Sequence, residues 1–186
     1  MELLECTLSI DDLDAFVADL GEIGDRHDVT IQAFDARYVV DRAHLERAVE
    51  LADRAIARGE NVARDRAVEI LLYAAGRRQI DRALEMGVDE GETRTVVLVD
   101  GGSTGNEGVP DGDGGSGDAT ADADEAAAVE AVTELAAVVA TEPTLEEPDE
   151  ETLSAFFEIT DAERGATDAS LSALVRERVA LLEVEK

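Results

Sequence analysis

The residues with the clearest chemical potential are arginines that follow a glycine in the middle of the chain. Arg77 and Arg78 come directly after Gly76, and Arg82 follows in the same polar stretch. Guanidinium groups form bidentate bonds with phosphate and carboxylate oxygens, so this cluster suits contact with an anionic partner. The structural alternative is a buried helix pair whose arginines are merely solvated. The residue pattern alone favours neither interpretation.

Apolar residues on both sides of Gly76 predict two short helices that meet at this glycine. Before the glycine, apolar positions recur at intervals typical of one helical face. They are Val68, Leu71, Leu72 and Ala75. The pattern restarts after the glycine at Ile80, Ala83 and Leu84. Gly87 then stands where a helix commonly ends.

The chain as a whole is strongly acidic, and its basic residues are almost all arginines. Its 186 residues include 45 acidic and 16 basic ones, for a net charge of −29. Because the helical periodicity argues against disorder, we interpret this acidity as adaptation to very high salt, where carboxylates keep a folded protein hydrated. Residues 37–82 are the exception, since acidic and basic residues nearly balance there. Helix-internal ion pairs or an anionic partner would explain that balance.

Short apolar segments predict strands, and longer periodic segments predict helices. Strands are expected at 2–8, 29–34 and 95–99, while residues 138–139 fit either a strand or the end of the helix expected at 121–140. Helices are expected near 12–24, 41–58, 65–87 with its glycine corner, 121–140, 153–157 and 168–182. This pattern predicts an α+β fold, in which a small β-sheet packs against several α-helices in a single domain.

Spacing also assigns side chains and segments to particular roles. Val17 is expected on the inner face of the first helix and Ile56 in the buried stripe of the helix at 41–58. Residues 179–184 can extend as a strand. His44 lacks metal-ligand or catalytic partners at suitable spacing, which favours a structural bond to nearby backbone.

One segment interrupts the predicted domain. Residues 1–100 and 125–186 are expected to form it, whereas residues 101–124 are rich in glycine and aspartate. Such composition predicts a flexible acidic insert.

Several classes of function find no support in the sequence. No nucleophile–base set, phosphate-binding loop or kinase motif is present, so neither an enzyme nor a cofactor or metal site is expected. Cys6 is the only cysteine, which excludes an internal disulfide. Without a signal peptide or a membrane-spanning segment, we expect a cytoplasmic protein.

Three segments around the glycine corner resemble a known family. They are residues 41–48, residues 58–65, and the run Glu69-Ile70-Leu71-Leu72-Tyr73 followed by Gly76, Gln79-Ile80, Ala83 and Gly87. Together they resemble the small subunit of the KEOPS complex, the PRPK-binding (TPRKB-like) family of archaea and eukaryotes. The resemblance covers residues 29–100 well and the last helix weakly, and it does not extend over residues 101–124.

The resemblance implies a fold and a function. KEOPS installs the threonylcarbamoyl group on the adenosine beside the anticodon of tRNAs that read codons starting with A. Its small subunit is non-catalytic, has an α+β fold and binds a PRPK-like kinase/ATPase, which in turn binds the OSGEP-like catalytic subunit. In archaea the small subunit also helps recruit tRNA through the 3′ CCA end.

The resemblance also implies site residues. The kinase contact is expected at Leu72, Tyr73, Ile80 and Leu84. The tRNA end is expected at Asn61, Arg64, Arg77, Arg78 and Gln79. For Asn61 alone, an Asx-type turn or a helix cap is the structural alternative. For the whole chain, the alternatives are a helix-turn-helix nucleic-acid binder built on residues 65–87 and a small-molecule enzyme with a convergent polar pocket.

Overall fold

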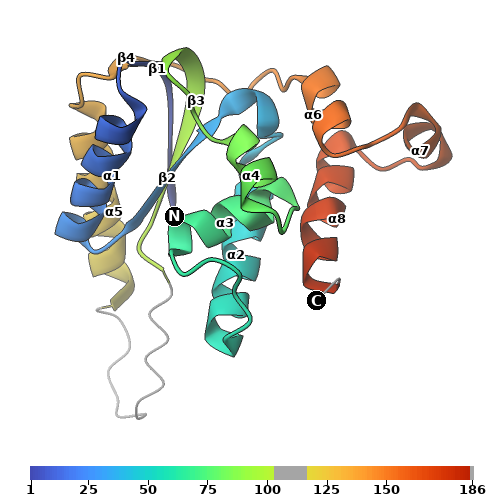
Figure 1. Ribbon diagram of the computed structural model, residues 1–186, viewed down its shortest axis with the longest axis horizontal. Coiled ribbons are helices and arrows are strands. Elements are labelled where there is room, and N and C mark those ends of the chain that lie inside the picture. The colour runs from blue at the N-terminus through green and yellow to red at the C-terminus, as the bar shows by residue number, and fades with distance from the viewer. Residues whose placement is uncertain (103–116, 185–186) are drawn as a thin grey trace.

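A four-stranded antiparallel sheet lies at the centre of the computed structural model, which describes residues 1–102 and 117–184 (Figure 1). The strands are β1 (Glu2–Ile10), β2 (Thr30–Asp35), β3 (Gly91–Asp100) and β4 (Val138–Thr141), in the spatial order β2-β3-β1-β4. β1 and β3 are longer than predicted because Gly91–Arg94, a polar end of β3, pairs with the last residues of β1. The predicted α+β fold is confirmed.

Alternation of side chains along the strands divides the core into two layers. On β3, Val97 and Val99 face one layer, whereas Val96 and Leu98 face the other. The first layer is closed by α1 (Leu13–His27) and α5 (Gly117–Thr133), which lie together on one side of the sheet in Figure 1. The second layer is closed by α2 (Arg42–Arg58) and α3 (Arg66–Ala75).

The C-terminal helices add a third layer beyond α2 and α3. They are α6 (Glu150–Phe156), α7 (Asp161–Ala166) and α8 (Leu171–Val184), and α8 contacts both α2 and α3. Val179 and Leu182 of α8 join the core that α2 and α3 share. A smaller cluster around Leu153 and Phe157 joins α6 to the first half of α8.

Local signals explain where the helices begin and end. Asp12, Asp41 and Asp65 each cap a helix by accepting a backbone N–H bond three residues on. Gly59 and Gly76 end α2 and α3 in the left-handed conformation, with φ of 67° and 59°. Both helix ends fall where the sequence placed a glycine stop.

Three expectations about side chains and segments are wrong. Val17 and Ile56 are exposed, because the buried face of α1 is centred on Phe16, Leu20 and Ile23 and the buried stripe of α2 ends at Ala55. Residues 179–184 are helical rather than extended, since Val179 and Leu182 continue the buried stripe of α8. The short helix α7 was not expected.

The predicted insert is only partly within the described residues. Helix α5 begins at Gly117, inside the range 101–124, so the last third of that range is helical. Residues 103–116 lie outside the described part of the chain.

A partly buried ion network joins the sheet to the second layer. The Arg66 guanidinium donates from Nε to Asp53 Oδ1 at 2.7 Å and from Nη2 to Asp100 Oδ2 at 2.5 Å. The Met1 amino group lies 3.6 Å from Asp100 and 2.7 Å from Glu125. Arg66 therefore links the end of β3 to α2.

Replacing Arg66 with methionine is expected to lower the free energy of unfolding by about 2 kcal/mol, because it leaves two poorly solvated carboxylates without their guanidinium. Urea denaturation measures the loss. The matched control is Arg82→Met. The Arg82 side chain is 68% exposed and that of its partner Glu85 is 46% exposed, so this variant should change stability by less than about 0.5 kcal/mol. Equal losses in the two variants would contradict the prediction.

Candidate functional site

The chain turns sharply where α3 ends. Gly76 is followed by α4 (Ile80–Ala83) and the 3₁₀ helix η2 (Leu84–Met86). The turn is closed by the Arg77 N–H, which donates to the Leu72 carbonyl at 3.0 Å. The predicted pair of short helices meeting at this glycine is confirmed, and we call residues 76–86 the corner.

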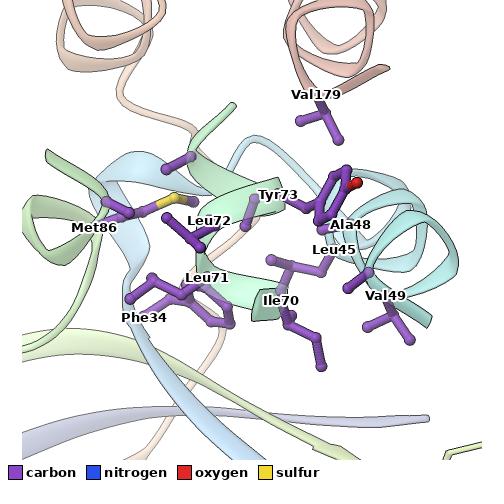
Figure 2. Packing of buried hydrophobic residues seen from close by; sticks show 14 of the residues in the cluster. Phe34, Leu45, Ala48, Val49, Ile70, Leu71, Leu72, Tyr73, Met86 and Val179 are labelled. Carbon is purple, nitrogen blue, oxygen red and sulfur yellow. The ribbon is translucent and has the colours of Figure 1, made fainter. Parts of the chain in front are cut away.

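The end of α3 that leads into the corner belongs to the core. Leu72 and Tyr73 are each only 1% exposed. Figure 2 shows Tyr73 lying between α2 and Val179 of α8, while Leu72 points towards Met86. Every residue of α3 from Glu69 to Ala75 is buried, because this helix has neighbours on all sides. A partner can therefore contact neither Leu72 nor Tyr73 directly in this conformation.

The outer side of the corner carries exposed apolar residues. Ile80 is 42% exposed and Leu84 is 55% exposed, although both are large aliphatic side chains. Next to the corner, a hollow of about 150 Å³ is bordered by Gly76, Arg77 and, from α8, Leu181. Leu181 is also exposed, so the side of this hollow that α8 provides carries an accessible apolar side chain.

The loop between α2 and α3 is held by side chains on both sides. Asn61 Nδ2 donates to the Ala63 carbonyl at 2.6 Å. Glu69 Oε2 accepts hydrogen bonds from the Val62 and Ala63 N–H groups at 3.0 and 2.8 Å. Asn61 thus bonds backbone two residues on and does not cap α3, whose cap is Asp65. Sequence reasoning missed Glu69.

The candidate RNA-binding arginines differ in what they already bind. Arg77 Nη2 donates to the Phe156 carbonyl at 2.7 Å and to Glu158 at 3.2 Å, so Arg77 ties the corner to α6. In contrast, Nε and Nη2 of Arg78 are buried and have no hydrogen-bond partner in the described chain. Arg64 is exposed and makes no ion pair with the described residues.

A small cavity connects the loop with the corner. Its volume is only about 10 Å³, and its walls include Val62, Glu69 and Arg78. Gln79 is exposed and stands at the N-cap of α4 without a side-chain bond to that helix. The structure therefore brings the loop of Asn61 and Arg64 next to the corner of Arg78 and Gln79.

Reactive groups elsewhere in the chain are buried or unaccompanied. Burial raises the pKa of the Cys6 thiol to about 11, which makes it a poor nucleophile at neutral pH. In residues 1–102 and 117–184, no group of three or more His, Cys, Asp or Glu side chains is arranged to hold a metal ion. None of the helices described there is both long and apolar enough to cross a bilayer.

The helix-turn-helix alternative lacks a recognition helix. α4 has only four residues, and its continuation η2 has three. An element of about two turns or fewer presents too few side chains to read a major groove. Asp81 and Glu85 on this segment would also repel phosphate.

Comparison with known proteins agrees with the resemblance seen in the sequence. The family model described as "Kinase binding protein CGI-121" matches residues 12–183, from the start of α1 to the end of α8. A comparison with curated proteins gives no match. Since the family model spans nearly all of the fold, the chain belongs to the CGI-121 family of kinase-binding proteins.

Proposed function

We propose that this chain is a non-catalytic subunit of the KEOPS tRNA-modification complex. In this role it binds and regulates a PRPK-like kinase/ATPase, and through the kinase it associates with the OSGEP-like catalytic subunit. It also helps to recruit tRNA through the 3′ CCA end. Membership of a kinase-binding family supports the first contact. Arg64 in the loop and Arg78 in the corner, which have no ion-pair partner among the described residues, support the contact with tRNA.

The kinase contact is best supported at Ile80 and Leu84. These two aliphatic side chains are four residues apart and exposed, so a partner can bury both together. Covering such side chains is worth on the order of 1–2 kcal/mol each. Leu72 and Tyr73, which the resemblance also implied, act from inside by holding the corner rigid.

Introducing a negative charge at either exposed aliphatic position tests this contact. Ile80→Glu and Leu84→Glu are expected to weaken binding of the purified PRPK-like kinase at least about tenfold in calorimetric titration. The controls are Val17→Glu and Val139→Glu, because these valines are 56% and 55% exposed but lie on α1 and β4. An equal effect at the four positions would place the contact elsewhere.

The tRNA end is best supported at Arg64 and Arg78, with Asn61 and Gln79 beside them. Nε and Nη2 form the side of the guanidinium that binds a phosphate in bidentate fashion. In Arg78 neither atom has a protein partner, but both are buried, so a phosphate reaches them only after the corner shifts. Arg77 would have to leave Glu158, so we assign it the secondary role of shaping the corner.

High salt restricts how RNA can be held. At molar ionic strength the Debye length is about 3 Å, and counterion release contributes little to affinity. Binding must then depend on directed hydrogen bonds and stacking. We expect tRNA to bind in molar salt only when its 3′ CCA is present, and Arg78→Met to weaken that binding about tenfold. Equal binding of tRNA with and without CCA would contradict the assignment.

We further propose that the chain works in the cytoplasm of an organism adapted to high salt. The net charge of −29 supports this interpretation. The free energy of unfolding should then rise as KCl is increased to molar concentration. A stability that gains nothing from salt would count against it.

A further inference from the structure

One buried acid controls the loop that carries two candidate RNA-binding residues. Glu69 is 1% exposed and lies in the first turn of α3. Its Oε2 accepts the N–H groups of Val62 and Ala63, at 3.0 and 2.8 Å. Hydrogen bonds from backbone N–H to a carboxylate are among the stronger ones in proteins, particularly away from water.

These bonds fix the backbone between Asn61 and Arg64. Ala63 is held from two directions, since its N–H donates to Glu69 while its carbonyl accepts from Asn61. The same Glu69 side chain borders the cavity that Arg78 lines. Its carboxylate therefore sets where the loop stands relative to the Arg78 side chain.

Helix α3 does not depend on these bonds for its own start. Asp65 Oδ1 accepts the Val68 N–H at 3.1 Å and thereby caps the helix. The bonds of Glu69 run backward to the loop rather than along α3. Loss of the carboxylate should thus release the loop while α3 and the apolar surface at Ile80 and Leu84 keep their places.

We propose that Glu69 is a positioning residue for RNA binding: it holds the loop so that Asn61 and Arg64 act together with Arg78 on a nucleotide end. This inference rests on the proposed tRNA contact. Glu69 itself does not bind RNA. A loop that is already ordered loses less conformational entropy on binding, so ordering raises affinity without a new contact.

The sign of the effect separates positioning from simple electrostatics. Removing a negative charge next to Arg78 should strengthen binding of an anion if only charge matters. Loss of positioning should weaken it instead. Glu69→Gln keeps an oxygen that can accept both N–H groups, whereas Glu69→Ala removes every acceptor.

The experiment compares Glu69→Ala, Glu69→Gln and the exposed control Glu85→Ala in the full chain. The measurements are affinity for tRNA with an intact CCA end, affinity for the kinase, and amide hydrogen exchange at residues 62–63. For Glu69→Ala we expect tRNA binding about tenfold weaker, faster exchange of both amides and kinase affinity unchanged. Glu69→Gln should restore tRNA binding to within about threefold, and Glu85→Ala should not weaken it.

The other outcomes distinguish failure of the positioning role from failure of the tRNA contact itself. Unchanged or stronger tRNA binding by Glu69→Ala would refute positioning, as would equal losses in the alanine and glutamine variants. Loss of kinase binding together with tRNA binding would show that Glu69 serves the whole fold. If the wild-type chain binds no tRNA, the proposed tRNA contact fails, and amide exchange still decides whether Glu69 holds the loop.

Discussion

Replacing Gly76 with alanine is expected to lower the free energy of unfolding by about 3 kcal/mol, for two reasons that add. Gly76 has φ of 59°, a conformation that costs an L-residue about 1–2 kcal/mol. A Cβ at this position would also lie 3.3 Å from the Arg178 carbonyl oxygen and 3.4 Å from its carbon. Because both atoms belong to the backbone of α8, relief requires moving a packed helix.

Gly59 provides the matched control for this prediction. It also ends a helix with positive φ, 67°, but an added Cβ there meets no atom within 4 Å. Gly59→Ala should therefore cost only the backbone term of about 1–2 kcal/mol. Urea denaturation of both variants measures the difference. Equal losses would mean that the close approach of α8 to the corner contributes nothing to stability.

Acidification is expected to cost the folded state about 3 kcal/mol through His44 alone. His44 is fully buried, with Nε2 2.8 Å from the Ala74 carbonyl and Nδ1 3.5 Å from the Val40 N–H. Val40 donates to Nδ1, so the proton of the neutral ring is on Nε2. Burial lowers the pKa of His44 to about 4; the carbonyl of Ala74 and the charge of Asp41 oppose this shift, and the charge of Arg176 adds to it.

The direction of the pH effect follows from that lowered pKa. At pH values between the unfolded pKa of 6.5 and the folded pKa of about 4, His44 is protonated in the unfolded chain but neutral in the folded chain. The stabilising contribution of neutral His44 is thus complete above pH 6.5 and is lost as the pH falls towards 4. Its largest effect falls at the acid end of this window.

Comparison of variants isolates His44 from the many carboxylates that titrate in the same range. The free energy of unfolding is measured at pH 7 and pH 4 for wild type, His44→Gln and His27→Gln. The His44 variant should be less stable at pH 7 but lose about 3 kcal/mol less on acidification than wild type. The partly exposed His27 serves as the control for replacing a histidine with glutamine. Equal pH dependence in wild type and His44→Gln would contradict the assigned burial cost.

Much of the fold follows from short-range signals in the sequence. The helix α2 between Asp41 and Gly59, and the corner after Gly76, were predicted because caps, glycine stops and apolar spacing act within a few residues. The complete burial of α3 could not be predicted from these short-range signals. Spacing identifies one apolar face of α3, but the second face is covered by α8, whose residues lie about a hundred positions later.

The sequence predicts which residue types form the candidate site, but not which of those side chains already have hydrogen-bond partners in the fold. A glycine corner rich in arginine singled out Arg77 and Arg78, yet only tertiary contacts show that Arg77 is bound to Phe156 and Glu158 while Arg78 is free. Glu69 was missed as a site residue. The available signal was an acidic residue among apolar ones in the first turn after a loop, where its carboxylate can reach backward to free N–H groups.

Hydrogen exchange of the chain bound to the PRPK-like kinase tests the central claim most directly. If the corner is the kinase contact, exchange should slow in residues 76–86 and in the adjoining end of α8 near Leu181. Amides of α1 and β4, which carry the equally exposed Val17 and Val139, should exchange as in the free chain. Slower exchange confined to α1 and β4, with exchange in residues 76–86 unchanged, would contradict the assignment of the kinase contact to the corner.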